Sequence, residues 1–85
     1  MKKIRLQGIG WYNAIEAKDL VVGDVILHNF GATSTVTSIY PSKSGKIISY
    51  HVVTNGSGYE ADCRTTVNRL FAVKRVNYLF IQYFS

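Results

Sequence analysis

The sequence predicts an all-β domain, folded as a small, strongly bent antiparallel barrel. Short runs of β-branched and aromatic residues recur along the chain, and turn residues separate them. No apolar pattern of helical period extends beyond a single turn. The chain has 85 residues, which is the size of one domain, so we expect a single domain over residues 1–85 with about five or six short strands.

The first two expected strands lie on either side of a tight turn. Residues 11–15 combine aromatic and apolar side chains, and a single helical turn is expected at residues 16–20. Gly23 supplies the positive φ that a tight turn can require, and the second strand, 24–28, follows it. Asn-Phe-Gly at residues 29–31 makes the next turn.

The middle of the chain predicts a meander. A loop that begins with proline and ends with glycine joins strand 34–40 to strand 46–54, and Asn-Gly-Ser-Gly at residues 55–58 makes a second hairpin turn. The strand at 59–67 alternates most regularly, and a last strand is expected at 70–73. Without a helix to cover its apolar face, such a sheet curls on itself, which favours an SH3-like barrel. The side chains expected on the inner face of strand 59–67 are Tyr59, Ala61, Cys63, Thr65 and Val67.

The C-terminal segment 76–85 is too apolar to be surrounded by water. We expect it to add an edge strand to its own barrel or to pair with another copy, which predicts a homo-oligomer. It is much shorter than the ~20 residues that a membrane-spanning helix needs, so no membrane partner is expected.

The charge and the cysteine content restrict the class of partner and the compartment. Ten Lys and Arg residues against five Asp and Glu residues give a net charge of +5, which attracts nucleic acid, nucleotides or an acidic protein surface. The alternative is a charge that serves solubility alone. Cys63 is the only cysteine, which excludes an internal disulfide and a thiolate metal site and favours a reducing, cytoplasmic setting.

Few residues are candidates for catalysis or metal binding. His28, His51, Cys63 and a few carboxylates are the available groups, and a cross-strand pair of His51 with Asp62 is conceivable. One such pair is not a site, and a structural contact on the surface is the simpler interpretation. Cys63 is expected to pack in the core. We therefore expect no catalytic residue, no metal site and no cofactor.

Basic and aromatic side chains together predict the binding surface. Small barrels hold single strands and nucleotides with cations on the phosphates and aromatic rings against the bases. The alternative is that the rings belong to the core and the charges are solvated. The predicted binding residues are Trp11, Tyr40, Lys43, Lys46, Arg64, Arg69, Lys74 and Arg75.

Two stretches carry a resemblance to known proteins. Residues 17–27, Ala-Lys-Asp-Leu-Val-Val-Gly-Asp-Val-Ile-Leu, resemble the lead-in to a strand in SH3-like barrels and in the Hint modules of inteins and hedgehog proteins. Splicing is not expected, because the chain has no nucleophilic Cys or Ser near its start and no terminal His-Asn pair. Residues 11–74, with Trp-Tyr-Asn-Ala, Leu-x-x-Gly-Asp-Val, Asn-Phe-Gly and Ser-Lys-Ser-Gly-Lys in this order, resemble small proteins of phages and prophages of Gram-positive bacteria.

This resemblance implies a protein that works by binding in the host cytoplasm, for example as a counter-defence inhibitor. Together with the charge, it predicts a non-enzymatic protein that holds an anionic partner on a basic face. The alternative is an oligomeric structural or assembly protein, such as a small virion component.

Overall fold

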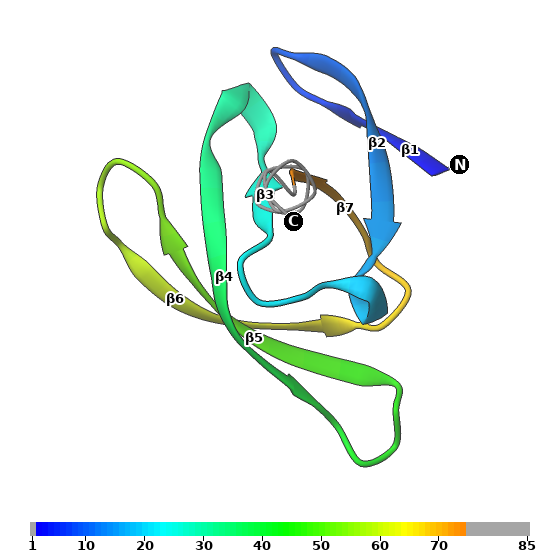
Figure 1. The fold of residues 1–85 in the computed structure, drawn as a ribbon. Coiled ribbons are helices and arrows are strands. Elements are labelled where there is room, and N and C mark those ends of the chain that lie inside the picture. Colours follow the sequence, from blue (N-terminus) through cyan, green and yellow to red (C-terminus); the bar gives the residue numbers. More distant parts are fainter. Residues whose placement is uncertain (1, 75–85) are drawn as a thin grey trace, which may run out of the picture.

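The computed structural model describes residues 2–74, which form one antiparallel sheet of seven strands (Figure 1). Their order across the sheet is β1-β2-β7-β3-β4-β5-β6. A short 3-10 turn follows β2 and another follows β3. The all-β prediction is therefore confirmed. The strands are β1 (Lys2–Leu6), β2 (Gly10–Glu16), β3 (Val25–Leu27), β4 (Thr33–Pro41), β5 (Ile47–Thr54), β6 (Glu60–Thr66) and β7 (Leu70–Lys74), and the 3-10 turns are Ala17–Asp19 and Asn29–Gly31.

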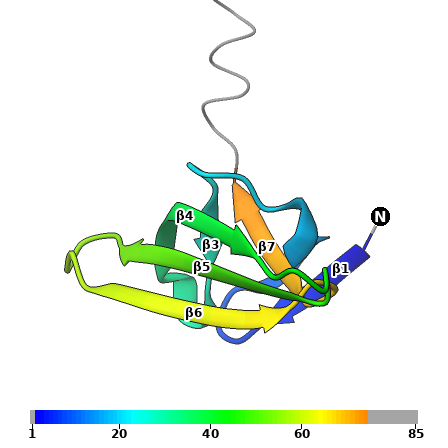
Figure 2. The same cartoon turned by 90° about the horizontal axis from the view of Figure 1, so that it is seen from below.

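The sheet is strongly curved but has two free edges. Figure 1 shows β2, β7, β3 and β4 following one another around the curve, while β5 and β6 pass below them. Figure 2 shows β4, β5 and β6 as three adjacent strands on one side of the molecule. The edges are β1 and β6, and no backbone pairing joins them within residues 2–74.

Strand β1 is not among the strands predicted from the sequence, and its edge position explains why. It pairs only with β2, from Lys2 opposite Ala14 to Leu6 opposite Gly10. Three of its five side chains are charged, and Leu6 is the one that is buried. Lysine and arginine on an edge strand discourage pairing with a second copy of the same edge, and they make this strand look like a basic terminus in the sequence.

The apolar core lies on both faces of the sheet at β7. Phe71 belongs to the main cluster and Ala72 to a second cluster, because adjacent residues of a strand point to opposite faces. The side chains of β5 alternate between the two faces of the sheet, and Ile48, Tyr50 and Val52 are all buried in the main cluster. The ring of Tyr50 meets that of Phe71 edge to face, with their centroids 5.7 Å apart.

The turn between the first 3-10 segment and β3 is built around a buried carboxylate. Asp24 is only 2% exposed, and its Oδ2 accepts a hydrogen bond from the backbone N–H of Val21 at 2.9 Å. Gly23 has a φ of 97°, which a glycine adopts without strain. The backbone of this turn exchanges two 2.8 Å bonds with Val36 of β4, so the turn fixes β4 to the rest of the sheet.

The structure corrects one inward assignment. Tyr59 lies before β6 and is 70% exposed, whereas the sequence places it on the inner face. The left-handed Gly58 and the bond from the Thr54 N–H to the Tyr59 carbonyl keep this residue in the hairpin turn. From Glu60 onward the predicted alternation is confirmed, and Cys63 packs against the core.

Two further expectations concern the C-terminal segment and membrane-spanning helices. The predicted edge strand or oligomer contact at residues 76–85 lies outside the described residues, as does Arg75. Within residues 2–74, no helix has the length and the apolar character needed to cross a membrane.

Candidate functional site

The outer face of β4, β5 and β6 brings together a tyrosine and an arginine from the predicted binding residues. Tyr40 pairs with Ser49, and Ser49 pairs with Arg64 on the next strand. Neighbouring strands are about 4.8 Å apart, so the backbones of Tyr40 and Arg64 are separated by about 10 Å, with a small side chain between them. Tyr40 is 63% exposed.

Two lysines stand at the end of this row of side chains. Lys43 and Lys46 lie in the loop between β4 and β5, which a bond of 3.1 Å from the Gly45 N–H to the Ser42 carbonyl closes. The Lys46 carbonyl accepts a bond from the Val67 N–H at 3.1 Å, so Lys46 lies beside the end of β6. Both lysines are exposed. We call Tyr40, Lys43, Lys46 and Arg64 the basic corner.

The cations of the basic corner have no ion-pair partner within residues 2–74, and the same holds for Lys3, Arg5, Arg69 and Lys74. Lys2 and Lys18, by contrast, both pair with Glu16, Lys18 at 3.2 Å. Hydrogen bonds from these two ammonium groups, that from Lys2 first, hold the pKa of Glu16 below its usual value. Part of the positive charge is thus compensated at the end of β2, while that of the basic corner is open to a ligand.

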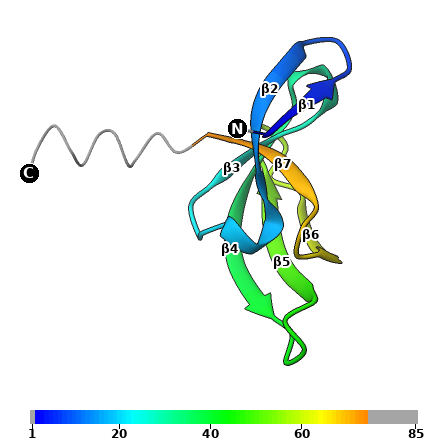
Figure 3. The same ribbon diagram turned by 90° about the vertical axis from the view of Figure 1, so that its right-hand side faces the viewer.

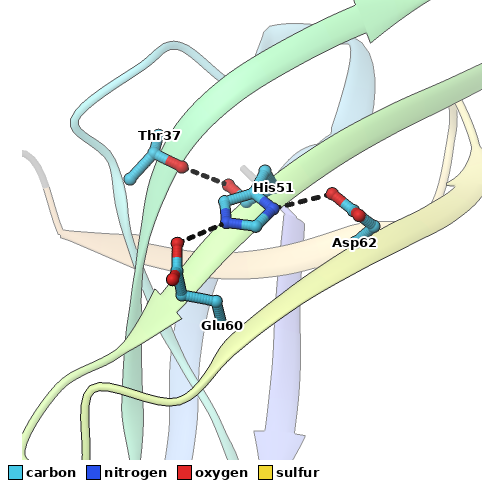
Figure 4. A network of polar contacts seen from close by, with 4 residues as sticks. All are labelled: Thr37, His51, Glu60 and Asp62. Carbon is cyan, nitrogen blue, oxygen red and sulfur yellow. Dashed lines mark hydrogen bonds and ion pairs between the residues drawn. The ribbon is translucent and has the colours of Figure 1, made fainter.

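The same outer face carries a compact polar cluster one row away from Arg64 (Figure 4). His51 Nδ1 lies 2.7 Å from Asp62 Oδ1, and His51 Nε2 lies 3.0 Å from Glu60 Oε1. Thr37 donates to the carbonyl oxygen of His51 at 3.2 Å. Because carboxylates only accept hydrogen bonds, the doubly protonated ring satisfies both contacts. The bonds to Asp62 and then to Glu60 raise the pKa of His51 above its usual value.

This cluster confirms the conceivable pair of His51 with Asp62 and gives it a structural role. Each ring nitrogen faces a different carboxylate, so the imidazole serves as a cross-strand ion pair between β5 and β6. Over residues 2–74, no group of three or more His, Cys, Asp or Glu side chains is arranged to hold a metal ion.

The remaining predicted residues lie apart from the basic corner. Trp11 is 67% exposed on β2, opposite Arg5 of β1. Figure 3 places this hairpin and the β4–β5 loop at opposite ends of the molecule. Lys74 is exposed at the end of β7, opposite Val25 of β3. The predicted surface is therefore divided among separate places.

Arg69 belongs to a second site, which sequence reasoning did not find. Its guanidinium carbon lies 5.3 Å from the centre of the Phe71 ring, at a pocket of about 190 Å³. His28, Asn29 and Tyr50 also line this pocket. Nothing in the sequence brings these residues together, because they come from separate strands and turns. The one signal is the alternation that places His28 on the same face as Ile26.

Comparisons with known proteins do not extend this description. The scan against family models, the search of curated proteins and the search of solved structures each found no match to the chain.

Proposed function

We propose that the chain is a non-enzymatic binding protein that holds a polyanion, in the first place single-stranded nucleic acid, on the basic corner. The observation that carries this proposal is the exposed Tyr40 ring among three cations without ion-pair partners in the described residues. Cations neutralise phosphates, and an exposed ring offers a base a stacking surface. A nucleotide or an acidic protein surface also meets the charge requirement, and a strand of bases meets it while offering several phosphates to the cations and a base to the ring.

The proposal includes the fold type and the biological setting. We propose that the curved sheet is a partly open relative of SH3-like barrels, a class that the β3–β6 meander and the pairing of β7 with β3 support. The resemblance to phage and prophage proteins supports a role inside the host cell, where a counter-defence protein would bind its target.

Fluorescence anisotropy with a labelled oligothymidine tests the binding. We expect affinity to fall steeply between about 50 and 200 mM salt, because bound phosphates release counterions. The double variant Lys46→Ala/Arg64→Ala should lower the slope of log affinity against log salt by about 1.4, since each phosphate contact to a single strand contributes about 0.7. Tyr40→Ala should weaken binding with the slope unchanged, since stacking involves no counterion.

The chain offers a matched control for this experiment. Lys3→Ala/Arg5→Ala removes the same two residue types from exposed positions of another strand, β1. This variant should keep the affinity and slope of the unmodified protein. An equal loss in both double variants would mean that only the total charge matters, and the proposal would be wrong.

Assembly through strand edges is a second candidate function, and one observation favours it. The free edge strand β1 carries Lys3 and Arg5 on one face, whereas the other edge strand, β6, carries Glu60 and Asp62 in its first half, before Arg64. Opposite charges on two free edges suit head-to-tail pairing of copies. Light scattering tests this: a concentration-dependent mass that Lys3→Glu/Arg5→Glu abolishes would support assembly, and a monomer at all concentrations would exclude it.

A further inference from the structure

A pocket of about 190 Å³ opens between β1, β3, β5 and β7, apart from the basic corner. Its apolar part includes Leu6 and Leu27, which belong to the second core cluster, and the ring of Phe71 from the main cluster. An engineered apolar cavity of about 150 Å³ is known to take up benzene, so this pocket has room for a small ring.

The charged group at this pocket is Arg69. Its guanidinium lies over the Phe71 ring, and within residues 2–74 it has no ion pair. His28 lines the same pocket, where burial first and the Arg69 charge second lower its pKa. The ring is therefore neutral at pH 7, and its Nε2 shares a 3.0 Å hydrogen bond with Ser34 Oγ.

The other polar groups of the pocket also favour an anion. The Asn29 side-chain oxygen accepts the Gln7 N–H at 2.9 Å, which leaves its amide N–H₂ as a donor. Burial, followed by the neighbouring Cys63, raises the pKa of Tyr50 to about 12, and the Tyr50 hydroxyl is hydrogen-bonded with Cys63, so it brings no negative charge to the pocket. No Asp or Glu lines the pocket. A planar guanidinium without a carboxylate partner suits a carboxylate ligand, which it can bind through two parallel hydrogen bonds.

We propose that this pocket binds a small organic carboxylate, with its anionic group at Arg69 and an apolar body of about the size of a benzene ring against Leu6, Leu27 and Phe71. This site goes beyond the proposed binding of nucleic acid, because it uses none of the four residues of the basic corner. The two sites can therefore be tested independently on one protein.

An NMR titration of the ¹⁵N-labelled protein with benzoate is the first test. We expect saturable shifts of the backbone signals of His28, Arg69 and Phe71. Benzamide has the same shape without the charge and should bind at least about tenfold more weakly, because a charge-assisted pair is replaced by neutral hydrogen bonds. Inorganic phosphate has the charge without the apolar body and should also bind more weakly.

The possible outcomes separate the parts of the proposal. No saturable shift with benzoate would overturn it. Equal affinity for benzoate and phosphate would overturn the apolar half, and equal affinity for benzoate and benzamide would overturn the role of the charge. Shifts confined to other parts of the protein would show that the ligand binds elsewhere and would also overturn the proposal.

Variants assign the anion to Arg69. Arg69→Gln should reduce benzoate affinity about tenfold, and Arg69→Lys should retain part of it, because lysine keeps the charge but lacks the planar fork. Lys74→Gln removes the same charge from an exposed position outside the pocket lining and should change nothing. Arg69 is exposed at a turn, so both substitutions leave the core intact. Arg69→Gln should keep its affinity for oligothymidine, and Lys46→Ala/Arg64→Ala its affinity for benzoate.

Discussion

His51 and Arg64 lie on the same outer face of β5 and β6, in neighbouring rows of cross-strand pairs. His51 is held between two carboxylates, at 2.7 Å from Asp62 and 3.0 Å from Glu60. Arg64 has only Ser49 opposite it. The two side chains thus share one face of the sheet, and they differ in what the register places across from them. The net charge of +5 does not show which positive side chains are compensated by carboxylates. That difference decides where an anionic ligand can bind.

The His51 cluster and the basic corner both lie on the face formed by β4, β5 and β6, and the turn at Asp24 holds β4 in place. A variant of this turn should therefore destabilise both. Asp24→Ala removes the buried acceptor of the Val21 N–H. A hydrogen bond to a charged group contributes about 1.5–3 kcal/mol, and we expect a loss of about 2 kcal/mol in the free energy of unfolding, measured by urea denaturation. Asp24→Asn keeps an acceptor oxygen and should lose less. Equal stability of Asp24→Ala and the unmodified protein would show that the turn holds without this side chain.

A charge reversal at Arg64 should remove the difference between the open charge of the basic corner and the compensated charge at His51. Arg64→Glu replaces an open cation with an anion beside Asp62, and we expect about a tenfold loss of affinity for oligothymidine at 100 mM salt, where one phosphate contact becomes a repulsion. Asp62→Asn removes an anion from the same strand face and should strengthen binding by a smaller factor. Anisotropy titrations of both variants check this. If both variants changed the affinity for oligothymidine in the same direction, the face would not consist of a cationic and an anionic part.

The alternation of β5 and β6 could be predicted from the sequence, but the position of Tyr40 could not be derived from alternation alone. Ser34 and Val36 point inward, and an unbroken strand would turn Tyr40 inward as well. The register shifts between Val36 and Ser38, so the strand gains one residue and Tyr40 emerges on the outer face. Such a bulge leaves no signature in the composition of the strand.

The pocket at Arg69 was beyond prediction for a different reason. Its lining comes from β1, β3, β5 and β7 and from the turns beside them. A pattern within one strand tells which face a side chain occupies, but not which distant strand it meets. The edge strand β1 also contributes to the pocket, and it was not predicted as a strand because three of its five side chains are charged.

The smallest expected effect is a shift in the titration of His51. Hydrogen bonds to Asp62 and Glu60 raise its pKa in the folded protein above the ordinary value of 6.5. A raised pKa means that the ion pair contributes stability below pH 6.5, and that this contribution is lost as the pH rises through the folded pKa. An NMR titration of the imidazole signals should show this pKa directly. Asp62→Asn should bring it back toward 6.5, and Glu60→Gln should do so to a smaller extent, because Asp62 is the larger cause.

His28 provides the internal reference for this measurement. Burial and the Arg69 charge lower its pKa, so the two histidines should titrate on opposite sides of 6.5 in the same sample. Arg69→Gln should raise the pKa of His28 and leave that of His51 unchanged, whereas Asp62→Asn should do the reverse. If His51 titrated at or below 6.5, its carboxylate contacts would not persist in solution. Asp62 and Glu60 would then repel a polyanion, and the difference in charge between the His51 cluster and the basic corner would be larger.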